Sequence, residues 1–317
     1  MVQISVIILV KNGGAFLGEV LEGLFSQKRV EAFEVVAVDS GSTDNSREIL
    51  NRYPVRVEEI PPGTFNHGET RNLGARLSQG TYLVYLTQDA VPGDDEWLAK
   101  LVEPLREDPL VAGAFSSHRP RKDCPLMEKR QILQTELTSG KEKRVNVAVG
   151  NPAYEWSPYP FIWFSNTSSC LLREVWERFP FRELEFAEDQ DWAKRVLEAG
   201  YKTVYVPDSI VIHSHHYRPI KNFRRYFEHA RAMKEIFGKE EFPHFKSIFS
   251  ATRRSMKDDF RFFQSEGGRS WGFLRWVFPS LFWYLAAFTG LWLGTHLEKI
   301  PLSLRERFSL QPSIIKK

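Results

Sequence analysis

The first 120 residues alternate short apolar runs with longer stretches in which apolar residues recur every three to four positions. The runs at residues 4–10, 33–38, 55–60 and 81–86 predict strands, three of them apolar enough to be buried on both faces of a parallel sheet. The intervening stretches at 15–26 and 68–78 predict helices. This alternation predicts an α/β fold with a doubly wound, mostly parallel sheet flanked by helices, which binds ligands at the carboxyl ends of its strands.

The pattern becomes less regular after residue 110, where we expect strands at 161–172, 201–206 and 210–213 and a helix at 188–199. After Pro219 the composition changes to basic and aromatic. The sequence therefore predicts an α/β catalytic domain over residues 1–219 and a helical, aromatic-rich C-terminal region over residues 220–317.

Residues 276–295 carry no formal charge and include seven aromatic side chains. Their length suits a membrane span, but aromatic residues are enriched at the membrane interface, and a full span would place one basic flank outside. We therefore predict in-plane or re-entrant attachment to a membrane surface, with a span or a helix buried on the catalytic domain as alternatives. The basic flanks comprise Arg253, Arg254, Lys257, Arg261, Arg269, Arg275, Lys299, Arg305, Arg307, Lys316 and Lys317.

Composition narrows the class of protein. With 42% hydrophobic residues, the chain can bury a sizeable core, and its two cysteines, Cys124 and Cys170, form no disulfide framework or zinc motif. The net charge of +3, from 43 basic and 40 acidic residues, gives no reason to expect nucleic-acid binding. Because the apolar N-terminal run lacks a basic flank and a cleavage site, we expect a buried strand rather than a signal peptide, and a cytoplasmic catalytic part.

Acidic residues follow two of the predicted strands. Asp39 and Asp44 lie in a Gly/Ser-rich turn directly after residues 33–38, where a carboxylate can accept hydrogen bonds from a nucleotide base or ribose. The alternative is a turn in which Asp44 or Ser42 caps the next helix. Asp89 follows residues 81–86 and suits a divalent cation such as Mg²⁺ or Mn²⁺, or is a turn residue before a proline. No P-loop or dinucleotide-binding glycine motif is present in the sequence.

Two further clusters lie later in the chain. Glu188, Asp189 and Asp191 open a predicted helix, where the helix dipole favours acids, but one of them can instead act as a general base. His213 and His215 lie two apart at a strand end and so share one face. Such a pair is either structural or a contact to a metal ion or a phosphate.

Taken together, these segments resemble the family 2 glycosyltransferases, which have the GT-A fold, over residues 3–219. The matching segments read ISVIILVKN, VDSGSTDNS, TRNLGA, LTQDAVP, AEDQDWAKRVLEAGY and HSH. The bacterial rhamnosyltransferase branch is the most similar. Its features are FNHG before TRNLGA, QDA in place of the usual Asp-x-Asp, Gly294 before Pro301, and the basic segment LSLRERFSL.

The resemblance implies roles for individual residues. Asp39 would contact the nucleoside of the donor, and Asp44 would help to hold that turn. Asp89 would bind the Mg²⁺ or Mn²⁺ ion that bridges the diphosphate. Because Thr87 or Gln88 stands where the first acid is often found, this site has one fewer carboxylate, and His213 or His215 could supply the missing ligand.

The acidic pair Glu188–Asp189 matches the catalytic pair of the family, with Asp189 as the base. An inverting transfer needs one base to take the acceptor proton and positive charge beside the leaving diphosphate, which Arg71 and the metal ion would provide. The expected donor is dTDP-rhamnose, with UDP- or GDP-sugars as alternatives. The expected acceptor is a glycan or lipid-linked saccharide in cell-surface polysaccharide synthesis, at the inner face of the cell membrane.

Two other functions fit parts of the sequence. A nucleotidyltransferase also uses an α/β sheet and a carboxylate-bound metal ion, but it normally brings a Gly- and Arg-rich loop after the first strand, of which KNGGAF is a poor version. A non-catalytic module that binds sugars or nucleotides at a membrane would not need the acid at Asp189, and that acid is present. Release of a nucleoside diphosphate from a nucleotide-sugar distinguishes the three functions.

Overall fold

The computed structural model describes residues 2–184, 186–242 and 244–308. By backbone contacts the chain divides into two compact units. The first extends to Arg121 and continues through Ile132–Leu184 and Glu188–His213, and the second holds the remaining residues, chiefly those from Ser214 onward. Two domains that meet at Pro219 stay a prediction, because compactness does not show that either part folds independently. Lys316, Lys317 and the last two residues of LSLRERFSL lie outside the described residues.

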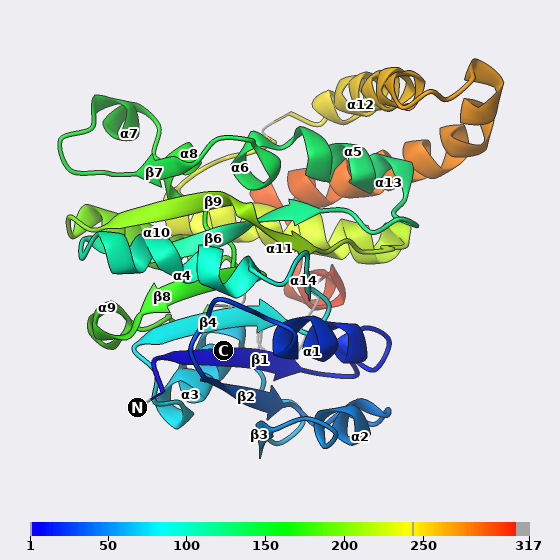
Figure 1. The fold of residues 1–317 in the computed structure, drawn as a ribbon. Helices are drawn as coiled ribbons and strands as arrows, with labels where there is room; N and C mark the ends of the chain where they lie inside the picture. The colour runs from blue at the N-terminus through cyan, green and yellow to red at the C-terminus, as the bar shows by residue number, and fades with distance from the viewer. Residues whose placement is uncertain (1, 185, 243, 309–317) are drawn as a thin grey trace. The chain divides into compact units, whose positions relative to one another are not determined.

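The first unit contains a nine-stranded sheet (Figure 1). Its strands are β1 (Ile4–Val10), β2 (Phe33–Asp39), β3 (Val55–Glu59), β4 (Tyr82–Thr87), β5 (Val91–Pro92), β6 (Val111–Arg119), β7 (Arg144–Asn146), β8 (Ser168–Leu172) and β9 (Lys202–Ile212). Their order among the described residues is β3-β2-β1-β4-β8-β6-β9-β5, and β7 pairs with β9. The β3-β2-β1-β4 half is parallel, as predicted, whereas β8 runs antiparallel to both β4 and β6.

The later strands differ from those expected. Strand β6 gave no clear sequence signal, and the strand expected at 161–172 is confined to Ser168–Leu172, after a short helix at Tyr159–Ile162. One strand, β9, replaces the two expected at 201–206 and 210–213. Its register against β6 shifts between Val206 and Ile210, so that a bulge accommodates the intervening proline without ending the strand.

Helices cover both faces of this sheet, because the apolar side chains of each strand alternate between two cores. Ile4, Val6, Ile8 and Val10 of β1 belong to one apolar cluster and Ile7 belongs to the other. Helices α1, α2 and α4 pack in the first cluster, and α3, α9 and α10 pack in the second. The helices of this unit are α1 (Leu17–Phe25), α2 (Ser46–Leu50), α3 (His67–Leu77), α4 (Trp97–Glu107), α6 (Glu136–Ser139), α7 (Pro152–Trp156), α8 (Tyr159–Ile162), α9 (Arg173–Arg178) and α10 (Glu188–Glu198).

The described part of the second unit is helical. Its helices are α5 (Leu126–Gln134, most of which lies in this unit), α11 (Pro219–Phe237), α12 (Ser247–Ser265), the 3₁₀ turns η1 (Ser270–Phe273) and η2 (Leu297–Lys299), α13 (Leu274–Thr295) and α14 (Leu302–Phe308). Helix α13 packs closely on α11 because two of its positions are glycines. A Cβ at Gly290 or Gly294 would lie 2.4 or 2.3 Å from a carbonyl oxygen of α11.

A buried ion pair links three helices of this unit. The Arg130 guanidinium of α5 donates to the fully buried Asp259 carboxylate of α12 at 2.7 Å and to the Tyr284 hydroxyl of α13 at 2.8 Å. The Tyr284 hydroxyl donates to the same Asp259 oxygen at 2.8 Å. Removal of any one partner would leave a buried polar group unsatisfied, so the network favours one arrangement of the three helices.

The segment Ser270–Thr295 is long and apolar enough to cross a membrane by length and composition, with a mean hydropathy of 1.4. One side of α13, which includes Trp283, Tyr284 and Ala287, is buried. The side that includes Leu274, Phe278 and Phe282 is exposed.

Gly74 provides a test of how closely α3 packs on the sheet. A Cβ at Gly74 would lie 2.4 Å from Cγ2 of Ile7 on β1, so α3 and β1 would have to move apart. We expect Gly74→Ala to lower the free energy of unfolding by about 1–3 kcal/mol, measured by urea denaturation. Gly18→Ala, in helix α1 with open space around the added methyl group, is the control and should be neutral or slightly stabilising.

Candidate active site

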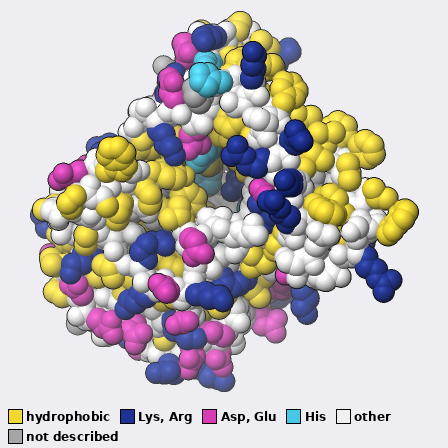
Figure 2. All heavy atoms as spheres, turned by 90° about the horizontal axis from the view of Figure 1, so that it is seen from above, with side chains coloured by type: hydrophobic (Ala, Val, Ile, Leu, Met, Phe, Trp, Pro, Cys, Tyr) yellow, Lys and Arg dark blue, Asp and Glu magenta, His cyan; other side chains and the backbone are white. Residues whose placement is uncertain are grey.

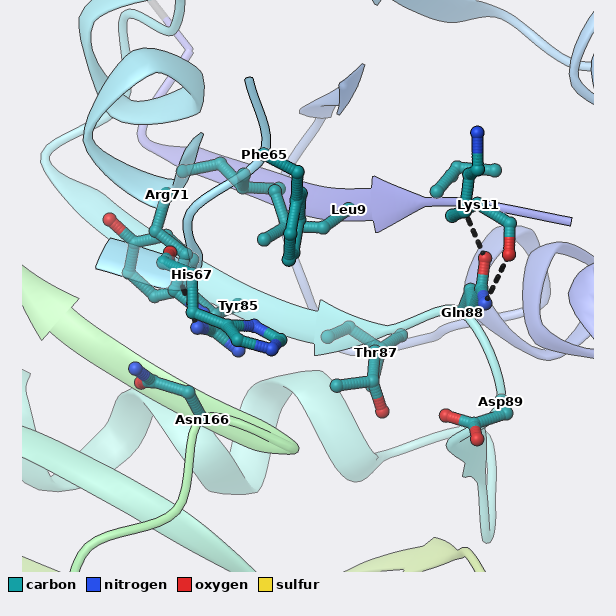
Figure 3. Close-up of a pocket in the computed structure, with 13 residues that line it drawn as sticks. Leu9, Lys11, Phe65, His67, Arg71, Tyr85, Thr87, Gln88, Asp89 and Asn166 are labelled. Atoms are coloured by element: carbon teal, nitrogen blue, oxygen red, sulfur yellow. Dashed lines mark hydrogen bonds between the residues drawn. The ribbon is translucent and has the colours of Figure 1, made fainter. Parts of the chain in front are cut away.

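The loops after β1 and β4 are joined at the carboxyl edge of the parallel strands. The Lys11 backbone N–H donates to Gln88 Oε1 at 2.9 Å, and Gln88 Nε2 donates back to the Lys11 carbonyl oxygen at 3.1 Å (Figure 3). The Lys11 ammonium donates to the carbonyl oxygens of Ser40 and Gly41 after β2. Gln88 therefore helps to hold the strand ends together.

The turn after β2 is held by its own acids. The Asp39 carboxylate is fully buried and accepts hydrogen bonds from Ser42 and from Arg47 Nε at 2.9 Å. Asp44 accepts from the backbone N–H groups of Gly14 and Ser46, both at 3.0 Å. Hydrogen bonding by Ser46 lowers the pKa of Asp44. Both acids thus shape the turn, and contact of Asp39 with a nucleoside stays a prediction.

Asp89 lies beside His213, as a shared metal site requires. His213 Nε2 is 3.5 Å from Asp89 Oδ1, and both side chains are largely buried. His213 follows β9 and Asp89 follows β4, so strands far apart in the sequence bring the two ligands together. His215 lies two residues further along the chain, in the second unit, and its role as a ligand stays a prediction.

A buried ion pair joins α3 to α10. The Arg71 guanidinium contacts the Glu188 carboxylate, and both side chains are more than nine-tenths buried. Burial alone would raise the pKa of Glu188, but the positive charge of Arg71 and hydrogen bonds that include one from Asn166 together outweigh it and leave the pKa below its usual value. His67, at the first position of α3, is partly buried, and the loss of surrounding water lowers its pKa, so the imidazole is neutral at neutral pH. Glu188 is therefore a stable anion here.

The pKa of Asp189 shifts in the opposite direction from that of Glu188. The Asp189 carboxylate accepts hydrogen bonds from the backbone N–H groups of Asn166 at 3.1 Å and Gln190 at 2.9 Å. Burial, together with the negative charge of Glu188, raises the pKa of Asp189 to about 7. Two adjacent acids with opposite pKa shifts are typical of an active site that uses one of them for proton transfer. Ala187, directly before the pair, has a φ of 61°, an unfavourable conformation for alanine that is often found at functional sites.

A pocket of about 280 Å³ is lined by some of these groups, among them Asp89, Arg71 and His67. Its lining includes Asp89 at one end and Asn166 and Arg71 at the other, with Phe65 and Leu9 between them (Figure 3). Because the Asn166 N–H binds the Asp189 carboxylate, the pocket extends from the candidate metal site to the vicinity of the candidate base. A substrate with a diphosphate and a sugar would have its reacting carbon between these two ends.

Several lining residues were not predicted from the sequence. Asn166 precedes β8 and carries no recognisable motif, and His67 was assigned only as part of the FNHG segment. The apolar run at 81–86 gives no reason to expect Tyr85 at a site, and Thr87 falls in the turn after that run, yet both residues line the pocket. The alternation along β4 was the one available signal, since Tyr85 and Thr87 share a face of the strand.

Comparisons with known proteins agree with the geometry. The sequence model of Glycosyl transferase family 2 matches residues 5–157. The chain is 27% identical to the O-antigen chain rhamnosyltransferase RfbN of Salmonella typhimurium, over 98% of this chain and 95% of that protein. It is 28% identical to the O-antigen chain rhamnosyltransferase WbaN of Salmonella anatum, over 91% of this chain and 88% of that protein.

Among solved structures, the chain is similar to the mannosyltransferase PcManGT from Pyrobaculum calidifontis, solved in complex with GDP-Man and Mn²⁺. The TM-score is 0.58, the sequence identity 18%, and the match covers 93% of this chain and 86% of that one. This likeness supports the predicted GT-A fold. Residues 5–157 therefore match the family 2 glycosyltransferases in sequence, and the fold and the glycosyltransferase relatives agree with that match.

Proposed function

We propose that the protein is an inverting rhamnosyltransferase that transfers rhamnose from dTDP-rhamnose to a glycan or lipid-linked acceptor in cell-surface polysaccharide synthesis. The observation that carries the proposal is the single pocket that extends from Asp89 to Asn166, whose backbone N–H binds the Asp189 carboxylate. The names of the two Salmonella relatives support rhamnose as the sugar. UDP- and GDP-sugars are the alternative donors.

Asp189 is the proposed general base. Its ionised carboxylate takes the proton of an acceptor hydroxyl as that oxygen attacks the anomeric carbon of the donor. The new C–O bond forms on the face opposite the leaving nucleoside diphosphate, which departs with the bonding electrons, so the configuration inverts. A base with a pKa of about 7 is ionised in a large fraction of molecules at neutral pH and still accepts a proton readily.

The proposed divalent ion is held by Asp89 and His213, with His215 as a third candidate. The donor set of a carboxylate oxygen and an imidazole nitrogen suits Mn²⁺ better than Mg²⁺, which prefers oxygen ligands. When bound, the ion neutralises charge on the diphosphate oxygens. Arg71 lines the same pocket, and Glu188 holds its guanidinium in place.

The donor's nucleoside is proposed to lie against the turn after β2. Asp39 and Asp44 hold this turn, and the carboxyl edge of parallel strands is the usual nucleotide site of such sheets. Asp39 would accept a hydrogen bond from the base or ribose in addition to those from Ser42 and Arg47.

Asp189→Asn tests the base. The substitution should lower kcat by about 10²-fold or more, because an amide cannot take a proton, while donor affinity changes by no more than about twofold. Transfer is followed by release of the nucleoside diphosphate, and donor binding by calorimetry. Transfer at nearly the wild-type rate would contradict the assignment, and release of pyrophosphate would indicate a nucleotidyltransferase.

The wild-type pH profile provides an independent check. Since only ionised Asp189 is active, kcat/KM should rise with pH through about 7 and reach about one tenth of its plateau at pH 6. The raised pKa also means that the folded protein binds this proton more tightly than the unfolded chain does. The contribution of Asp189 to the free energy of unfolding is therefore lost as the pH rises from about 4 to about 7. Asp189→Asn removes that loss and should melt no lower than wild type at pH 8.

Two variants, Asp39→Asn and Asp89→Asn, distinguish a role in binding the nucleoside from a role in binding the metal ion. Asp39→Asn should weaken donor binding to the same extent with and without Mn²⁺, because its contact is with the nucleoside. Asp89→Asn should remove most of the strengthening by Mn²⁺ and leave metal-free binding close to that of wild type. Calorimetric titration of each variant in Mn²⁺ and in chelator measures both effects. Equal metal dependence in the two variants would refute this division of roles.

The exposed face of α13, formed by Trp271 in the preceding turn with Leu274, Phe278 and Phe282, is proposed to attach the enzyme in the plane of the cytoplasmic membrane surface. Basic residues Arg253, Arg254 and Lys257 on α12 and Arg275 on α13 are also exposed. Figure 2 shows hydrophobic and basic side chains interspersed on the molecular surface. Because one side of α13 packs on α11, in-plane attachment suits it better than a span. This placement would bring the site to a lipid-linked acceptor.

The combined variant Leu274→Ser, Phe278→Ser and Phe282→Ser tests attachment. Each apolar side chain contributes about 1.5–3 kcal/mol at most on burial, so vesicle binding should fall by about tenfold or more. Binding of wild type to anionic vesicles should decrease with salt but persist, because the apolar contribution is not screened. Trp156→Ser, which alters an equally exposed aromatic residue of the first unit, is the control and should bind as wild type does. Equal sedimentation of all three proteins with vesicles would refute the proposal.

A further inference from the structure

In the middle of the pocket, two lining residues on the sheet, Tyr85 and Thr87, carry hydroxyl groups, and the residues beside them are apolar. Strand pairing places Ile7 opposite Tyr85 and Leu9 opposite Thr87, and these four side chains share one face of the sheet. Phe65, which precedes α3, lies beside Leu9 (Figure 3). In the proposed function the diphosphate lies at Asp89, and the general base, Asp189, lies near Asn166. The sugar ring must then occupy this middle part.

Two hydroxyl groups of residues that line the pocket lack hydrogen-bond partners in the part of the chain that the structure describes. Tyr85 Oη and Thr87 Oγ1 are buried, and neither has a hydrogen-bond partner among the described residues. Tyr85 is 1% exposed, and burial raises the pKa of its hydroxyl, so the group stays protonated and able to donate. Buried hydroxyls are almost always hydrogen-bonded in native proteins, so these two indicate a polar ligand that completes them.

The apolar side chains next to these hydroxyl groups cannot provide such bonds. Phe65 and the neighbouring Leu9 of the sheet carry no polar side-chain atoms, and the nearby Arg71 guanidinium is already paired with Glu188. The His67 imidazole, whose ring lies edge-on to that of Phe65, is a polar side chain of the same lining. A hydroxyl placed against Phe65 and Leu9 would lose its hydrogen bonds to water without replacement, whereas a methyl group would gain apolar contact.

We propose that this part of the pocket selects a 6-deoxyhexose. The hydroxyls of Tyr85 and Thr87 hydrogen-bond to ring hydroxyls of the donor sugar, and Phe65 with Leu9 contacts its C6 methyl group. The proposal rests on the proposed function, since it assigns the sugar of the same donor. Tyr85 and Thr87 are binding residues in it, and Phe65 is the specificity-determining residue.

The role of these hydroxyl groups is tested by removal of one of them. Tyr85→Phe should weaken binding of dTDP-L-rhamnose about five- to tenfold, measured by calorimetry in Mn²⁺, because one hydrogen bond is lost. The matched control is Tyr205→Phe, which removes a buried hydroxyl bonded to the Gly140 carbonyl oxygen away from the pocket. It should lower the Tm and leave donor affinity unchanged. Unchanged donor affinity in Tyr85→Phe would overturn the role of the hydroxyl groups.

The apolar contact is tested with two donors that differ at one atom. The second is dTDP-L-mannose, which is dTDP-L-rhamnose with a hydroxyl on C6. Wild type should prefer the rhamnose donor in kcat/KM by about 10–100-fold, the range that an apolar pocket achieves against an added hydroxyl. Phe65→Ser should reduce this preference by about tenfold. Phe245→Ser, which alters an exposed phenylalanine of the second unit, should preserve it.

The outcomes separate the two proposals. Equal use of both donors by wild type, or an unchanged preference in Phe65→Ser, overturns the deoxy-sugar selection while the proposed transferase function stands. Transfer only from donors with a hydroxyl at C6 overturns both the selection and rhamnose as the sugar. Loss of transfer in Asp189→Asn is independent of either donor comparison, so failure of the base assignment is recognised separately.

Discussion

The buried ion pair between Arg71 and Glu188 determines what the neighbouring Asp189 can do. Because Arg71 keeps Glu188 ionised, a negative charge lies beside Asp189 in a largely dehydrated site, and the pKa of Asp189 rises to about 7. Without Arg71, the two buried carboxyl groups would share one proton and one negative charge. The proton would then not belong to either residue, so neither would be the proposed base by itself. The pair also connects α3 with the start of α10, so the electrostatics of the base and the position of its helix depend on the same contact.

The sheet explains how such distant residues meet. Strands β1, β2 and β4 place three loops at one edge, and the antiparallel β8 enters beside β4 so that the segment before it, which includes Asn166, reaches the same edge. From there the Asn166 N–H binds Asp189. The pocket then has the candidate metal site at one end and, at the other, Asn166, whose N–H binds the candidate base. This is the order that the proposed function requires.

Gln88 helps to hold this edge together. The two hydrogen bonds between Gln88 and the Lys11 backbone join the loops after β1 and β4 without adding a charge. Asp89 is the carboxylate at this strand end, and His213 lies 3.5 Å from it, so the two could share the proposed ion. A site with one carboxylate and an imidazole binds a divalent ion less tightly than a pair of carboxylates, and it favours a softer metal.

The sequence by itself determined the parallel half of the sheet and the acids at its edge. A continuous apolar run such as Ile4–Val10 can be stable only when both of its faces are buried, and the polar residues that follow such runs must then emerge at one edge. The family 2 glycosyltransferase prediction is confirmed on these segments. The sequence did not reveal β6, whose Gly and Ser residues pack among β8, β9 and Trp97 rather than forming an apolar run. Only the tertiary structure decided that Arg71 pairs with Glu188, that Asn166 binds Asp189, and that Tyr85 and Thr87 face the pocket. These contacts join residues remote in the chain, and a pKa or an unsatisfied hydroxyl is a property of the surroundings rather than of the residue type.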